Sequence, residues 1–236
     1  AKTVYVEVKN GFRKYRLCAA LCGFRIVMTP GLAMFYGGLV RKKNVVNTMM
    51  TSIFIIGIGI VMWVLFGYSL SFAPSGNAFI GDFRWLGLEG VSLTEGYTDG
   101  ASIPNMVFSA FQMMFAVITP ALITGAVAGR MKFKSIFVFT IFWSLIVYYP
   151  LAHMVWGQGG LLGADGIGAL DFAGGDVVHI SSGVSALVLC ILLGKRHDYE
   201  HSIYRIHNIP TVVLGASLLM FGWFGFNAGS ALAADG

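Results

Sequence analysis

The sequence has few charged residues: Asp, Glu, Lys and Arg make up only 11% of its 236 positions. A soluble domain of this length carries about a quarter of such residues. The formal charge of +5 does not indicate a nucleic-acid-binding protein, because the basic residues cluster in short links between apolar runs. This composition excludes an ordinary soluble domain and predicts an integral membrane protein.

Cysteine is also scarce, and so are the motifs of cofactor chemistry. Cys18, Cys22 and Cys190 lie in or beside apolar runs, which is typical of small buried side chains and gives neither a disulfide framework nor a metal-ligand spacing. No nucleotide-binding loop is present, and the first apolar run lacks the small-residue pattern of a signal-peptide cleavage site. We therefore expect no metal, no cofactor and no enzyme activity.

Apolar residues are abundant: 56% of the chain is hydrophobic and its mean hydropathy is +0.75. Roughly 20 apolar residues are needed to cross a bilayer as a helix, and the chain contains six runs of about that length. They predict an all-α polytopic membrane helix bundle, formed by residues 17–236. The expected helices lie near 17–40, 45–72, 103–129, 134–156, 171–194 and 209–231.

Residues 1–16 precede this transmembrane domain as a polar arm. Their alternating pattern around Asn10-Gly11 is a hairpin signal, and it is equally compatible with a disordered or vector-derived arm. Within the first apolar run Arg25 is unusual at membrane depth. It must snorkel to the surface, have a partner in the protein, or precede the true start of the helix.

The charges of the links predict the orientation of the helices. The links after the first, third and fifth helices are basic, and the other two are acidic or lack basic residues. The basic links contain Arg41, Lys42 and Lys43; Arg130, Lys132 and Lys134; and Lys195, Arg196 and Arg205. Because basic links are retained on the cytoplasmic side, we predict an amino terminus outside the cell. The basic arm at 1–16 opposes this prediction, and the three concordant links outweigh it.

The fifth run carries titratable side chains, which are expensive at membrane depth and are usually functional. Helical spacing places His179 on a small and polar face with Asp176 and Ser182. We expect this face to contact protein. The opposite face, with Val177 and Val178, is then expected to meet lipid or packed apolar neighbours. The alternative is a buried histidine that hydrogen bonds to a backbone carbonyl.

Four segments end at the predicted outer face or point toward it. Phe115 lies in the third helix, Trp156 ends the fourth, Asp171 begins the fifth as a helix cap would, and Ser230 ends the sixth. Aromatic faces beside a hydroxyl suit a small cation that sheds its water. Taken singly, each residue has a plainer interpretation: Trp156 as an interface residue, Phe115 as packing and Asp171 as a cap.

Longer strings carry a family resemblance. The segments MTPGLAMFYGGLVRKKNV, AHMVWG, LDFAGGDVVHI and HNIPTVVLGASLLMFGWFGFNAGSA resemble the ammonium transporter (Amt/Mep/Rh) family, in the family's order and from about Met28 to Ala231. The resemblance implies that Trp156, Phe115 and Ser230 form an outer cation-recruitment site. It further implies a gate of Phe115 and Phe226, a pore residue His179, and an Asp171 that shapes the outer site.

The same resemblance implies a channel-like transporter of ammonium or ammonia, with methylammonium as an analogue. It would be a multi-pass protein of the plasma membrane, in contact with lipid, and a homotrimer with one pore per subunit. A PII-type regulator at the cytoplasmic face is implied for the complete protein only. No nucleic acid is expected as a partner.

The chain also departs from the family. The family has two inverted five-helix repeats and one further helix, whereas this sequence is expected to hold the first repeat plus one helix, without the second pore histidine. We therefore expect a truncated inverted-repeat fold that is inactive alone. Asp176 has no assigned role. The alternatives are an ammonium-sensing membrane receptor on the same fold, a haem protein with histidine ligands, and a fragment that folds only in part.

Overall fold

The computed structural model describes residues 20–74, 77–98, 101, 103–164, 166–196, 199 and 203–232. The polar arm at 1–16 lies outside the described residues, and so does Cys18. The described part of the chain is helical, and its only β-type pairing is an isolated bridge between Gly96 and Pro104.

Six helices are long and apolar enough to cross a membrane, which confirms the predicted all-α bundle. The first covers Ala20–Leu39 and ends with α2 (Met28–Leu39), the third is α5 (Asn105–Val127) and the sixth is α9 (Ile209–Gly229). The other three contain a short π-helical turn. The second span comprises η1 (Lys42–Asn44), α3 (Val45–Met62), η2 (Trp63–Gly67) and α4 (Tyr68–Phe72). The fourth comprises α6 (Phe133–Trp143), η4 (Ser144–Tyr148) and α7 (Tyr149–Trp156), and the fifth η5 (Gly175–Ile180) and α8 (Ser181–Leu193).

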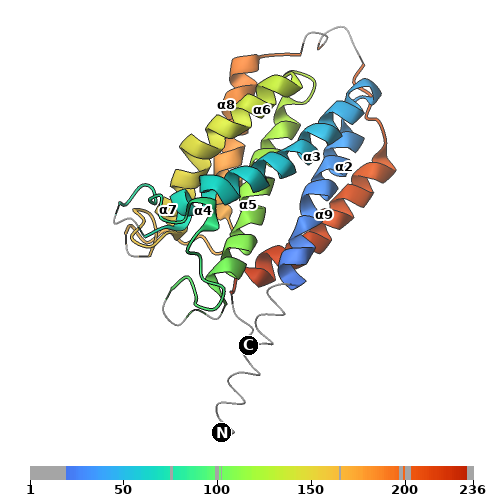
Figure 1. Cartoon of the computed structure of the whole chain (residues 1–236). Coiled ribbons are helices and arrows are strands. Elements are labelled where there is room, and N and C mark those ends of the chain that lie inside the picture. Colours follow the sequence, from blue (N-terminus) through green and yellow to red (C-terminus); the bar gives the residue numbers. More distant parts are fainter. Residues whose placement is uncertain are drawn as a thin grey trace.

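The helix α5 runs through the middle of the bundle, and the other helices surround it (Figure 1). It is the most buried of the six spans. Helices α2 and α9, far apart in the sequence, pack side by side (Figure 1). Their backbones approach closely at Gly215, where an added Cβ would stand 2.3 Å from the backbone nitrogen of Phe35. Small residues at such a contact let membrane helices pack tightly.

The links after α2, α5 and α8 lie at one end of the bundle, the upper end in Figure 1. Their basic side chains gather there: the guanidinium carbons of Arg41 and Arg196 lie 5.5 and 4.8 Å from the ring centre of Tyr204. Arg130 donates a 2.9 Å hydrogen bond to the carbonyl of Gly194. The opposite end carries the link with η3 (Leu86–Leu88) and the link after α7.

The bundle is open on one side. Helices α8 and α9 present exposed apolar side chains, among them Leu187, Ile191, Val213 and Phe224. In the link before η5, Leu170 is 99% exposed. A contiguous apolar surface of this kind marks contact with lipid or protein.

Candidate functional site

The end of the bundle opposite the basic links, which is the predicted outer end, holds a cavity of about 240 Å³, the outer cavity. Phe115, Trp156, Asp171 and Ser230 all line it, although they come from four different parts of the chain. The structure therefore brings together the three residues of the implied recruitment site and the aspartate implied to shape it. Tyr97, Phe111 and Gln112 complete much of the wall.

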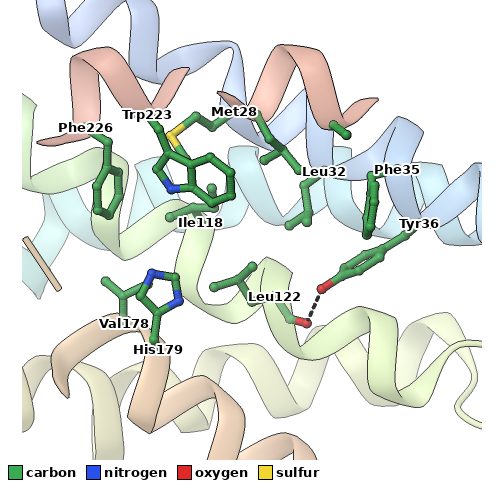
Figure 2. Close-up of a pocket in the computed structure, with 12 residues that line it drawn as sticks. Met28, Leu32, Phe35, Tyr36, Ile118, Leu122, Val178, His179, Trp223 and Phe226 are labelled. Carbon is green, nitrogen blue, oxygen red and sulfur yellow. Dashed lines mark hydrogen bonds between the residues drawn. The ribbon is translucent and has the colours of Figure 1, made fainter. Parts of the chain in front are cut away.

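A second cavity, of about 260 Å³, lies deeper in the bundle. His179 and Phe226 line it together with apolar side chains of α2, α5 and α9. Figure 2 shows the His179 imidazole extending from η5 toward Trp223 and Phe226. Elsewhere in the wall of this cavity, the Tyr36 hydroxyl donates a hydrogen bond to the carbonyl of Leu122. His179 also lines a more open hollow of about 440 Å³ that reaches Asp171 and Asn227.

The side chains of Phe115 and Phe226 contact each other, one from the wall of each cavity. Their ring centres lie 4.4 Å apart, and the residues are only 1% and 3% exposed. Phe115 lines the outer cavity and Phe226 lines the inner one. The walls of the two cavities thus meet at this pair of rings.

Asp171 organises the loop that carries the outer site. Its carboxylate accepts hydrogen bonds from the backbone nitrogens of Gly174, Gly175, Asp176 and Val177, at 2.5, 2.8, 2.8 and 3.0 Å. A carboxylate at this end of a helix satisfies N–H groups that have no partner within the helix and complements its dipole. The backbone carbonyl of Asp171 accepts a 2.9 Å bond from Trp156 Nε1. One residue thus holds both the start of the fifth span and the indole of Trp156.

The outer cavity offers aromatic faces and uncharged oxygen acceptors. The Trp156 and Phe115 ring centres are 5.2 Å apart. The Ser230 hydroxyl donates to the carbonyl of Phe226 at 2.8 Å, which leaves its oxygen lone pairs available to a donor in the cavity. Burial raises the pKa of Tyr97 to about 12, so this phenol adds no negative charge at neutral pH.

Sequence reasoning missed Gln112 and Tyr97 as parts of the outer wall. The Gln112 Oε1 atom is buried and has no hydrogen-bond partner among the described residues. Helical spacing puts Gln112 on the same face as Phe115. Only the cavity distinguishes a wall residue from a packing residue, because both are buried on the same helix face.

In η5, Val177 and Val178 are buried, at 0% and 1% exposure, so they meet packed apolar neighbours rather than lipid. His179 lines the inner cavity and is exposed on its other side. The turn is π-helical: the His179 nitrogen bonds to the carbonyl of Gly174 five residues earlier. This wider turn shifts side chains from the positions that 3.6-residue spacing predicts.

His153 has a different environment from His179. It is 0% exposed, and its two ring nitrogens lie 3.1 and 2.8 Å from the carbonyl oxygens of Ser71 and Asn77. A neutral imidazole donates through one ring nitrogen, so this histidine bonds to one of these carbonyls and ties α7 to the end of the second span or the link after it. It is not positioned to bind a haem iron together with His179.

Fold and site together define a class of protein: a polytopic helical membrane protein with one cavity lined by aromatic side chains and a second cavity lined by a histidine. The chain belongs to the Ammonium Transporter Family, whose sequence model matches residues 17–236.

Named relatives agree with this assignment. An ammonium transporter of Bacillus subtilis (strain 168) is 55% identical over 211 residues, which is 89% of this chain and 50% of that protein. The ammonium transporter Amt1 of Archaeoglobus fulgidus is 43% identical, over 89% of this chain and 50% of that protein. The chain thus spans about half the length of the curated relatives it matches.

Solved structures share the fold. Candida albicans Mep2 matches with a TM-score of 0.83 at 34% identity, over 94% of this chain and 49% of that one. A structure described as a sensor Amt protein matches with a TM-score of 0.83 at 27% identity, over 97% of this chain and 57% of that one.

Proposed function

We propose that the chain forms the outer recruitment site, the gate and one wall of the pore of a channel-like transporter for ammonium or ammonia, rather than an enzyme. The observation that carries the proposal is the order of the cavities. Phe115, Trp156 and Ser230 line the outer cavity, and the Phe115–Phe226 pair lies between it and the cavity of His179.

The chemistry of the outer cavity suits a small cation. Ring faces attract a cation by about 0.5–2 kcal/mol each, depending on desolvation, and the Ser230 oxygen accepts one of its hydrogen bonds. Such contacts hold ammonium without trapping it. Rings 4.4 Å apart leave no room for a hydration shell, so the ion sheds its water or its proton at the gate. Beyond it, a neutral imidazole can donate one hydrogen bond and accept one.

The pore of the intact protein needs further walls. His179 is exposed on the side where the described residues provide no cover. We propose that another segment of the transporter or another subunit supplies this wall. A homotrimer with one pore per subunit, and a PII-type regulator at the basic end of the bundle, complete the proposal.

A second candidate function is an ammonium-sensing receptor on the same fold. It is supported by the likeness to the structure described as a sensor Amt protein. The two functions differ in one measurement, because a sensor binds ammonium with little flux, whereas a transporter moves it.

The recruitment site is tested at Trp156. The test protein is a chimera of this chain and the part of the Bacillus subtilis transporter that the chain does not match. Trp156→Leu removes one ring face, so half-saturation for methylammonium should rise about 2- to 30-fold, the equivalent of the cation–π contribution. Uptake of radiolabelled methylammonium in liposomes gives this value. The matched control is Trp85→Leu, outside the outer cavity. Unchanged half-saturation in the Trp156 variant would remove this residue from the site.

The gate is tested at Phe226 in the same chimera. Truncation of a core Phe to Ala typically costs 3–5 kcal/mol of folding stability and lowers the yield of folded protein. Phe226 borders the inner cavity and the open hollow, so part of its ring faces empty space rather than packed side chains. Phe226→Ala should therefore change methylammonium flux several-fold and leave the yield nearly intact. Phe72→Ala, at a fully buried aromatic, is the control that should lower the yield. Loss of folded Phe226→Ala protein would favour the packing interpretation.

We propose a plasma-membrane location with the amino terminus outside and the basic links in the cytoplasm. The test uses single cysteines at two exposed positions, Lys43→Cys and Glu95→Cys, in a chain whose native cysteines are serine. In whole cells an impermeant thiol reagent should label the Glu95 variant only, and in inside-out vesicles the Lys43 variant only. Labelling of both variants from one side would contradict the proposed topology.

A further inference from the structure

The side chain of Arg25 lies against the aromatic gate. Its guanidinium carbon is 3.7 Å from the ring centre of Phe115, 3.8 Å from that of Phe111 and 4.7 Å from that of Phe226. The residue is 2% exposed. A permanently charged group thus contacts both members of the ring pair at which the walls of the outer and inner cavities meet.

The polar partners of this guanidinium are few. Nη1 donates a 2.8 Å hydrogen bond to the backbone carbonyl of Phe111. Nε and Nη2 are buried without a hydrogen-bond partner among the described residues. Within that part of the chain the ion pair found joins Arg84 to Asp82 and does not involve Arg25. A buried cation without a carboxylate is costly, so the ring faces are its main source of stabilisation.

Helix packing, rather than a loop, determines this position. At Gly225, one residue before Phe226, an added Cβ would stand 2.5 Å from the carbonyl oxygen of Leu21 and 3.3 Å from Arg25 Cγ. The missing side chain lets the first span approach α9. The stem of Arg25 therefore passes directly beside the helix turn that carries the gate ring Phe226.

We propose that Arg25 is a specificity-determining residue of the gate: an internal cation that competes with incoming ammonium for the faces of Phe115 and Phe226. This inference rests on the proposed function and deepens it. A ring that already contacts a guanidinium attracts a second cation less strongly, and two like charges in a site of low dielectric repel each other. With Arg25 in place, the outer site binds cations weakly, and passage as a charged species through the gate is opposed.

The first test measures equilibrium binding of radiolabelled methylammonium to the 236-residue chain in lipid nanodiscs. Arg25→Leu keeps the helix apolar and frees the rings, so methylammonium should bind about tenfold more tightly than to the wild type, a size typical of one cation–π contact. Arg41→Leu removes a charge from the far end of the same span and should leave the affinity unchanged. Circular dichroism and size-exclusion chromatography verify that each variant is folded. If a variant does not fold, the same substitution is tested in the chimera.

The second test adds a soluble substitute for the side chain. In Arg25→Ala, guanidinium ion should compete with methylammonium, and it should not do so in the wild type, where the rings already hold a guanidinium. Equal methylammonium affinity for wild type and Arg25→Leu would overturn the inference, as would absence of competition in Arg25→Ala. Binding to none of the proteins would also overturn it. The proposed function is judged separately by the flux of the Trp156 chimera, so that the two failures are distinguishable.

Discussion

Liposomes that contain the purified 236-residue chain should show no ammonium flux above that of empty liposomes. The inner cavity of His179 continues into an open hollow bordered by Leu170 and Phe172, both strongly exposed. In a bilayer that hollow would fill with lipid chains, or another protein surface would cover it. A continuous polar path past His179 therefore cannot close within the described residues of one chain.

The measurement is a stopped-flow assay of internal pH after an ammonium pulse. The chimera with the unmatched part of the Bacillus subtilis transporter is the positive control, because it supplies the wall that we propose. In that chimera His179→Ala should change transport rate or ion selectivity while the protein stays folded. Robust flux from the 236-residue chain alone would show that the present helices suffice to form a pore.

Replacing Asp171 by Ala should both destabilise the protein and abolish methylammonium binding at the outer site. The carboxylate accepts four backbone hydrogen bonds, and bonds to a charged acceptor contribute about 1.5–3 kcal/mol each. Water replaces part of this loss, because Gly175 is exposed. We therefore expect a net cost of roughly 2–4 kcal/mol, or a fall in melting temperature of roughly 5–15 °C. Trp156 would also lose the fixed carbonyl to which its indole donates.

Thermal unfolding in detergent and methylammonium binding check this prediction together. Asp171→Asn retains one carbonyl acceptor, so its melting temperature and its methylammonium affinity should lie between those of the wild type and Asp171→Ala. Asp176→Asn is the matched control, since it removes a carboxylate from the same turn without touching the four bonds. An Asp171→Ala protein with wild-type melting and binding would show that the loop keeps its shape without the carboxylate.

The sequence alone determined the helical membrane architecture. Runs of about 20 apolar residues have few other stable structures than spanning helices, because every backbone polar group must be satisfied within lipid. The basic residues at 41–43, 130–134 and 195–205 could be assigned to one end from their order alone, and the structure gathers them there (Figure 1). The strings around His179 and Phe226 were long enough to indicate the family.

Only the tertiary structure decided which side chains meet. Phe115 and Phe226 come from helices far apart in the chain, and helical periodicity gives the face of a residue but not its partner. The structure also decided that Val177 packs inside the protein rather than against lipid, an alternative that the sequence had left open. The sequence left three interpretations of Arg25 open. The close approach at Gly225 resolved them, since a backbone contact between two helices determines how deep a side chain lies, and no local pattern encodes that distance.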